Sequence, residues 1–73
     1  MSIFKLRSIE NDTSIVLAID ATVPITDQLV PLLNSTNVRV FLYENYHTMI
    51  PWVHTAEEAK QLLSTMDVEI EYT

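Results

Sequence analysis

Apolar residues recur with a period of two in the first part of the chain, which is the spacing of β-strands. Residues 2 to 9, SIFKLRSI, place Phe4 and Leu6 on one face and two basic residues on the other, as in a half-buried strand. Residues 14 to 21, SIVLAIDA, are apolar on both faces until Asp20, a pattern typical of a strand inside a sheet. We therefore expect two strands joined by a polar turn, the second of them central.

Residues 67 to 73 alternate strictly between apolar and polar side chains, with an acidic residue at most of the polar positions. Such alternation predicts a strand with one buried and one solvated face. The positions expected to point inward are Val68, Ile70 and Tyr72.

A first helix is predicted in residues 22 to 34, TVPITDQLVPLLN, where apolar residues recur at helical spacing and Pro24 suits an early helical position. Pro31 complicates this prediction, because proline costs about 3 kcal/mol inside a helix. We expect either a short helix that begins near Asp27 or a kinked one. Asn34 is the expected C-terminal stop.

A second helix is predicted in residues 55 to 66. Thr55 and Glu58 form a capping box at its start. The apolar positions that follow keep helical spacing, and they are Ala56, Ala59, Leu62, Leu63 and Met66.

The aromatic residues concentrate between residues 37 and 54, NVRVFLYENYHTMIPWVH. Residues 38 to 43 alternate and predict a strand with Arg39, Phe41 and Tyr43 on one face. Residues 49 to 53 predict a second strand at an edge of the sheet, since Pro51 cannot donate to a ladder.

The expected fold is an α+β domain over residues 1 to 73, with two helices on one face of a four- or five-stranded, mostly antiparallel sheet. The expected order is ββαββαβ. From residue 14 onward this order resembles the βαββαβ arrangement of ferredoxin-like folds, preceded by an extra N-terminal strand. A different α+β strand order is the alternative, because a tight hairpin between the first two strands would occupy an edge that the ferredoxin-like order needs.

Composition excludes several classes of site. The chain has no glycine, so phosphate-binding loops of the Walker or Rossmann type are excluded, and no cysteine, so disulfides and thiolate metal sites are absent. Without glycine, positive backbone angles are expected mainly at asparagine or aspartate. The turn candidates are Asn11, Asp12, Asn34, Asn37 and Asn45.

Charge and hydropathy bear on partners and location. The net charge of −6 disfavours direct contact with nucleic acid or anionic lipid. The start of the chain mixes charged and apolar residues, unlike a secretion signal, and no apolar run is long enough for a membrane span. We expect a cytoplasmic protein.

Candidate catalytic and metal-binding residues are few. Asp20 at a strand end lacks a recognisable acid-base partner, and His47 and His54 lack the spacing of a metal site. We therefore predict no catalytic residues, no metal and no cofactor, with Asp20 in a turn, His47 in a turn and His54 ahead of a helix cap.

The candidate partner-binding residues are aromatic residues with a neighbouring arginine. Aromatic and arginine side chains are enriched at the centres of protein interfaces. Two helices cover only one face of a sheet, so the other face is expected to be available for a partner or for a second copy. The predicted contact residues are Arg39, Phe41, Tyr43 and Trp52.

An acidic face is the second candidate surface. Residues 57 to 73 hold five acidic residues against Lys60, and a row of carboxylates on a strand has spacing of the same order as neighbouring phosphates. This surface either imitates nucleic acid toward a basic groove or is a solvated face partly neutralised by Lys5, Arg7 or Arg39. Its residues are Glu57, Glu58, Asp67, Glu69 and Glu71.

The function expected from these features is non-catalytic. We predict a protein-binding regulator or inhibitor, with the character of a phage or mobile-element protein that acts on a host macromolecular machine. The alternatives are an acidic mimic of nucleic acid that occupies a basic groove, and a structural homodimer subunit.

Overall fold

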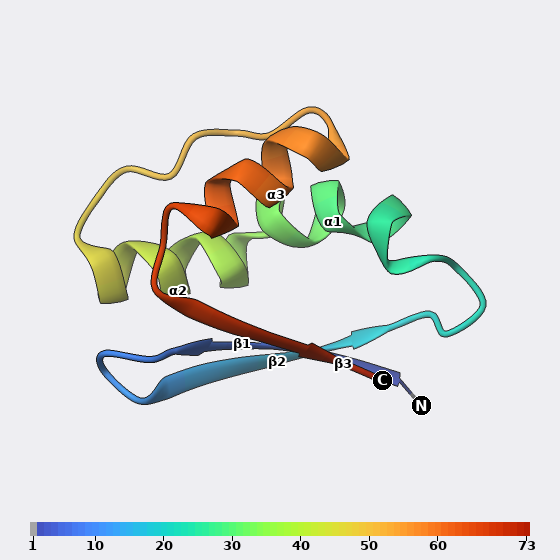
Figure 1. Cartoon of the computed structure of the whole chain (residues 1–73), viewed down its shortest axis with the longest axis horizontal. Helices are drawn as coiled ribbons and strands as arrows, with labels where there is room; N and C mark the ends of the chain where they lie inside the picture. The colour runs from blue at the N-terminus through green and yellow to red at the C-terminus, as the bar shows by residue number, and fades with distance from the viewer. Residues whose placement is uncertain (1) are drawn as a thin grey trace.

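Three antiparallel strands carry three helices on one face, so the molecule has two layers (Figure 1). A computed structural model describes residues 2–73. In chain order the elements are β1 Ser2–Ser8, β2 Thr13–Ile19, α1 Ile25–Asn34, α2 Thr36–Tyr46, α3 Ala56–Ser64 and β3 Val68–Tyr72.

The strand order is β2-β1-β3, so the N-terminal strand is the central one. β1 pairs with β2 from Ser2 opposite Ile19 onward, and with β3 from Phe4 opposite Tyr72 onward. The prediction that residues 14 to 21 form the central strand is therefore wrong. β2 is an edge strand because the tight hairpin fixes it on one side of β1, while β3 returns from the helices to the other side.

The core lies between the sheet and the helices. β1 contributes Phe4 and Leu6, which are fully buried, and each helix contributes two buried side chains. The buried apolar residues are Phe4, Leu6, Leu29, Leu33, Val38, Leu42, Ile50, Val53, Ala59 and Leu63.

Residues 38 to 43 form the middle of helix α2, which overturns the predicted strand. The same residues fit a helical period, because Val38 and Leu42 are one turn apart and both are buried. Ser35 caps this helix by accepting a hydrogen bond from the backbone N–H of Val38. The strand prediction rested on a period of two and missed that the same residues also fit a helix.

Residues 49 to 53 belong to an extended loop and form no strand, so the predicted edge strand is also wrong. The loop is nevertheless anchored, because Ile50 and Val53 are each only 4% exposed. The Asn34 side chain donates to the Val53 carbonyl (2.8 Å) and accepts from the Val53 N–H (3.0 Å). These two bonds replace the ladder that Pro51 disfavours.

The expected order ββαββαβ is thus replaced by ββαααβ, with three strands and three helices. The fold is α+β as predicted, but the sheet has neither four nor five strands. The error has one origin: the segment predicted as a strand hairpin is a helix followed by a loop.

The remaining elements follow the sequence pattern. The Thr55 side chain accepts from the N–H of Glu58 (3.1 Å), as the capping box predicts. In β3 the residues Val68, Ile70 and Tyr72 face the helical layer as predicted, but this face is not buried, because Ile70 and Tyr72 are exposed. Helix α1 begins at Ile25 and continues through Pro31 to Asn34, so it is not the short helix that would begin near Asp27. Pro24 precedes the helix as its N-cap residue.

Positive backbone angles occur at Asp12 (φ 53°) and His47 (φ 54°) among the described residues. Asp12 closes the β1–β2 hairpin, as predicted, and His47 ends α2 in a left-handed conformation. The prediction of a turn with a positive angle was wrong for Asn37 and Asn45, which lie within α2. Asn34 has no positive angle either, but it ends α1 as the predicted C-terminal stop.

We predict that Asn34→Ala lowers the free energy of unfolding by about 2 to 4 kcal/mol, because it leaves the buried N–H and C=O of Val53 without partners. Urea denaturation followed by far-UV circular dichroism measures the change. Asn37→Ala, at an exposed position of α2, serves as the control and should change stability by less than about 0.5 kcal/mol. An equal loss in both variants would contradict the role of Asn34.

Candidate functional site

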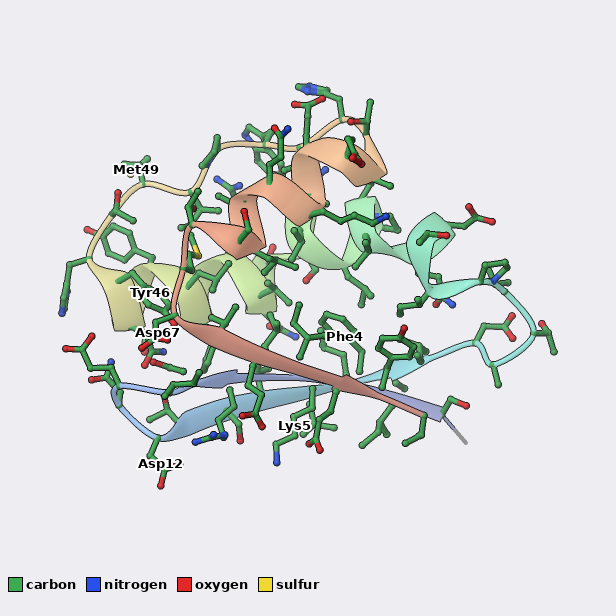
Figure 2. All side chains as sticks on the ribbon, viewed as in Figure 1. Phe4, Lys5, Asp12, Tyr46, Met49 and Asp67 are labelled. Carbon is green, nitrogen blue, oxygen red and sulfur yellow. The ribbon has the colours of Figure 1, made fainter. Side chains whose placement is uncertain are left out.

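Exposed apolar side chains gather where the outer face of α2 meets the loop that follows it. They line a shallow hollow of about 380 Å³. Figure 2 shows Met49 at the outer edge of this loop, away from the sheet. We call this surface the aromatic patch and define it as Arg39, Val40, Tyr43, Met49 and Trp52.

Helical geometry selects the members of the patch. Tyr43 lies four residues after Arg39 and three after Val40, so it shares a face of α2 with both. Phe41 is turned away from them and packs, partly buried, against the core. Three of the four predicted partner-binding residues thus come together and Phe41 does not.

Arg39 stacks on the Trp52 ring. The centre of its guanidinium group lies 3.9 Å from the centroid of the indole, a cation–π contact between helix and loop. Arg39 Nη1 is buried, and no described residue accepts a hydrogen bond from it. The contact packs one side of the exposed indole against α2.

Four of the five side chains in the patch are exposed. The exposed fraction is 48% for Val40, 53% for Tyr43, 79% for Met49 and 60% for Trp52. Tryptophan, tyrosine, methionine and arginine are the residue types enriched at interface centres. Sequence reasoning missed Val40 and Met49, because their place on the patch depends on α2 being a helix.

The predicted acidic residues do not form one surface. Glu69 and Glu71 lie on the sheet face opposite the helices, because Val68, Ile70 and Tyr72 of the same strand face the helical layer. Glu57 and Glu58 lie in the first turn of α3, in the other layer. Asp67 precedes β3, and its carbonyl accepts from the Tyr46 hydroxyl at 2.7 Å; both residues are labelled in Figure 2.

Basic residues of β1 pair with the carboxylates of β3. Arg7 lies 3.0 Å from both Glu69 and Asp12, and Lys5 lies 3.9 Å from Glu71. The hydrogen bonds from Arg7, first to Glu69 and then to Asp12, raise the pKa of its guanidinium. These contacts agree with the expectation of a partly neutralised face, although Arg39 lies elsewhere, on α2.

The weaker candidates for catalysis or metal binding are Asp20, His47 and His54, and each lies in a turn or at a helix end. Asp20 Oδ1 accepts from the Thr22 hydroxyl (2.6 Å) and the Thr22 N–H (2.9 Å), and these bonds lower the pKa of Asp20. His47 ends α2, while Nδ1 of exposed His54 lies 3.8 Å from a Glu58 oxygen. Within residues 2–73, no group of three or more His, Asp or Glu side chains is placed to hold a metal ion.

The chain matches no family model, no curated protein and no solved structure. Among the helices of residues 2–73, none has both the length and the apolar character needed to cross a membrane.

We predict that Thr22→Ala raises the pKa of Asp20 toward its ordinary value, because the hydroxyl donor is lost. The lowered pKa of Asp20 contributes stability above its unfolded-state pKa, and this contribution is lost as pH falls through the folded-state pKa. NMR titration of the Asp20 carboxyl measures the shift. Thr26→Ala, at an exposed position of α1, should leave the titration unchanged.

We predict that Arg39→Ala frees the Trp52 ring and increases quenching of its fluorescence by acrylamide. Loss of the stack should cost about 0.5 to 1 kcal/mol of stability. Arg39→Lys should retain part of the contact and give intermediate quenching. Unchanged quenching in Arg39→Ala would contradict the proposed fixing of Trp52.

Proposed function

We propose that this chain is a non-catalytic protein-binding regulator or inhibitor that contacts its partner through the aromatic patch. The observation that carries the proposal is the gathering of exposed Tyr43, Met49 and Trp52 beside Arg39. Large apolar side chains grouped on one surface are favourable when a partner removes them from water.

The fixed tryptophan adds to the support. A side chain already held in one orientation loses little conformational entropy on binding. Arg39 holds Trp52 from the side of α2, so the ring is available to fill a pocket in a partner. This arrangement has the properties of an interface hot spot.

The net charge favours a partner with a basic surface around that pocket. A chain with a charge of −6 is attracted to positive surfaces over several ångströms, which increases the rate of encounter. Small size and acidity suit a phage or mobile-element protein that acts on a host macromolecular machine.

A mimic of nucleic acid has less support than a protein-binding regulator. Glu69 and Glu71 already pair with Arg7 and Lys5, and Glu57 and Glu58 lie in the other layer of the fold. A structural homodimer would bury the same aromatic patch against its copy, so the test must separate self-association from partner binding.

The test is affinity capture from a host lysate, followed by binding of the purified captured protein to variants of this chain. Tyr43→Ala/Trp52→Ala is expected to weaken that binding by about 30-fold or more, because both residues lie in the proposed contact. Val16→Ala is the matched control, since Val16 is 53% exposed on β2, outside the patch. Circular dichroism checks that each variant is folded.

Equal binding by the double variant and the wild type would overturn the proposal. Light scattering of the isolated chain at high concentration tests the homodimer. A dimer mass that reverts to monomer in Tyr43→Ala/Trp52→Ala would assign the patch to self-association instead.

A further inference from the structure

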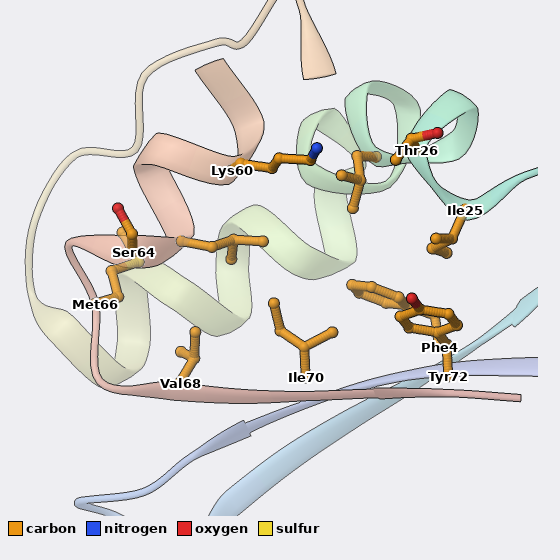
Figure 3. A pocket seen from close by; sticks show the side chains of 11 residues that line it. Phe4, Ile25, Thr26, Lys60, Ser64, Met66, Val68, Ile70 and Tyr72 are labelled. Atoms are coloured by element: carbon orange, nitrogen blue, oxygen red, sulfur yellow. The ribbon is translucent and has the colours of Figure 1, made fainter. Parts of the chain in front are cut away.

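A groove lies between β3 and the helices α1 and α3, at the edge of the sheet that β3 forms (Figure 3). It has a volume of about 650 Å³ and a mainly apolar lining. Ile70 and Tyr72 rise into it from β3, and Lys60 of α3 extends above it (Figure 3). We call it the β3 groove; it shares no residue with the aromatic patch.

Alternate residues of β3 point their backbone N–H and C=O groups toward β1 and away from it. The Asp67 carbonyl accepts from Ile9 N–H, and Thr73 N–H donates to the Ile3 carbonyl, both at 3.1 Å. In an antiparallel pair, hydrogen-bonded residues alternate with residues whose N–H and C=O point the other way. The even-numbered residues of β3 therefore point their N–H and C=O groups away from β1; they are Val68, Ile70 and Tyr72. On that side no strand of residues 2–73 pairs with them.

The side chains at this edge are also incompletely covered. Ile70 is 40% exposed and Tyr72 is 55% exposed, although both face the helical layer. At the opposite edge, the inward residues of β2, including Leu17, are half-buried against the core. Both outer strands are edges, but the inward side chains are left exposed at the β3 edge and not at the β2 edge.

Charge distinguishes the possible occupants of this edge. A strand added antiparallel to β3 places every second side chain in the groove and the others opposite Glu69 and Glu71. Glu69 and Glu71 already pair with Arg7 and Lys5 on the β1 side. A carboxylate has two oxygens and can accept further hydrogen bonds, so lysine or arginine at those positions would share it with the β1 residue. A second copy of β3 paired symmetrically about Ile70 would instead place Glu69 opposite Glu71 of the copy, and like charges directly opposite are destabilising.

We propose that the β3 edge binds an extended segment of another protein as a fourth strand. The segment alternates apolar residues, which fill the β3 groove, with basic residues, which lie opposite Glu69 and Glu71. Backbone hydrogen bonds to Ile70 and its even-numbered neighbours supply affinity, while the groove and the two carboxylates select the sequence. This site does not depend on the aromatic patch.

The test uses an array of synthetic peptides of about seven residues, the length of an ordinary strand. The peptides of the basic array alternate an apolar residue (valine, isoleucine, leucine or phenylalanine) with lysine or arginine. A matched acidic array carries glutamate in place of lysine or arginine. Binding to the ¹⁵N-labelled chain is followed by NMR. We expect members of the basic array to shift the amides of Val68, Ile70 and Tyr72 and to slow their hydrogen exchange.

Two changes probe the proposed contacts separately. Glu69→Gln/Glu71→Gln should weaken binding of the basic peptides about fivefold and reduce its salt dependence. N-methylation of the peptide at its apolar positions removes the N–H groups that face β3 and should abolish binding without affecting this chain. N-methylation at the basic positions, whose N–H groups face away, is the control.

Four results would overturn the proposal. They are no binding from the basic array up to about 1 mM, equal binding of the acidic array, shifts confined to the aromatic patch, and protection of the Ile70 and Tyr72 amides by self-association of the free chain. Tyr43→Ala/Trp52→Ala should bind the basic peptides as the wild type does. Failure at the β3 groove is therefore distinguishable from failure at the aromatic patch.

Discussion

The pairing of β1 on both of its sides is the constraint on which the rest of the structure depends. It places Phe4 and Leu6 at the centre of the sheet, fully buried beneath the helices. It also makes β2 and β3 the edges, because three strands leave each outer strand with one paired side. The exposed backbone of β3 and the groove above it follow from this order.

The loop between α2 and α3 both completes the core and presents the aromatic patch. Ile50 and Val53 enter the core, and Asn34 of α1 holds the Val53 backbone with two hydrogen bonds. Met49 and Trp52 are consequently left on the outside, where Arg39 orients the indole. A residue in α1 thereby helps to position a surface formed by α2 and the loop.

The two proposed surfaces differ in their physical basis. The aromatic patch offers fixed side chains that suit a pocket in a folded partner, whereas the β3 groove offers unpaired backbone groups beside an apolar hollow that suit an extended segment. Ion pairing of Glu69 with Arg7 and of Glu71 with Lys5 reduces the negative charge at the sheet surface. Neither surface requires catalytic chemistry.

The sequence by itself determined the elements whose signals are local: the alternation of β1 and β3, the hairpin into β2, and α3 with its Thr55 cap. It also supplied the interface residue types Arg39, Tyr43 and Trp52. Only the tertiary structure decided the conformation of residues 38 to 43, whose apolar positions fit both periods. In the folded chain this segment satisfies its backbone hydrogen bonds internally as a helix and buries Val38 and Leu42. The helix turns Phe41 toward the core and brings Val40 to the patch beside Met49.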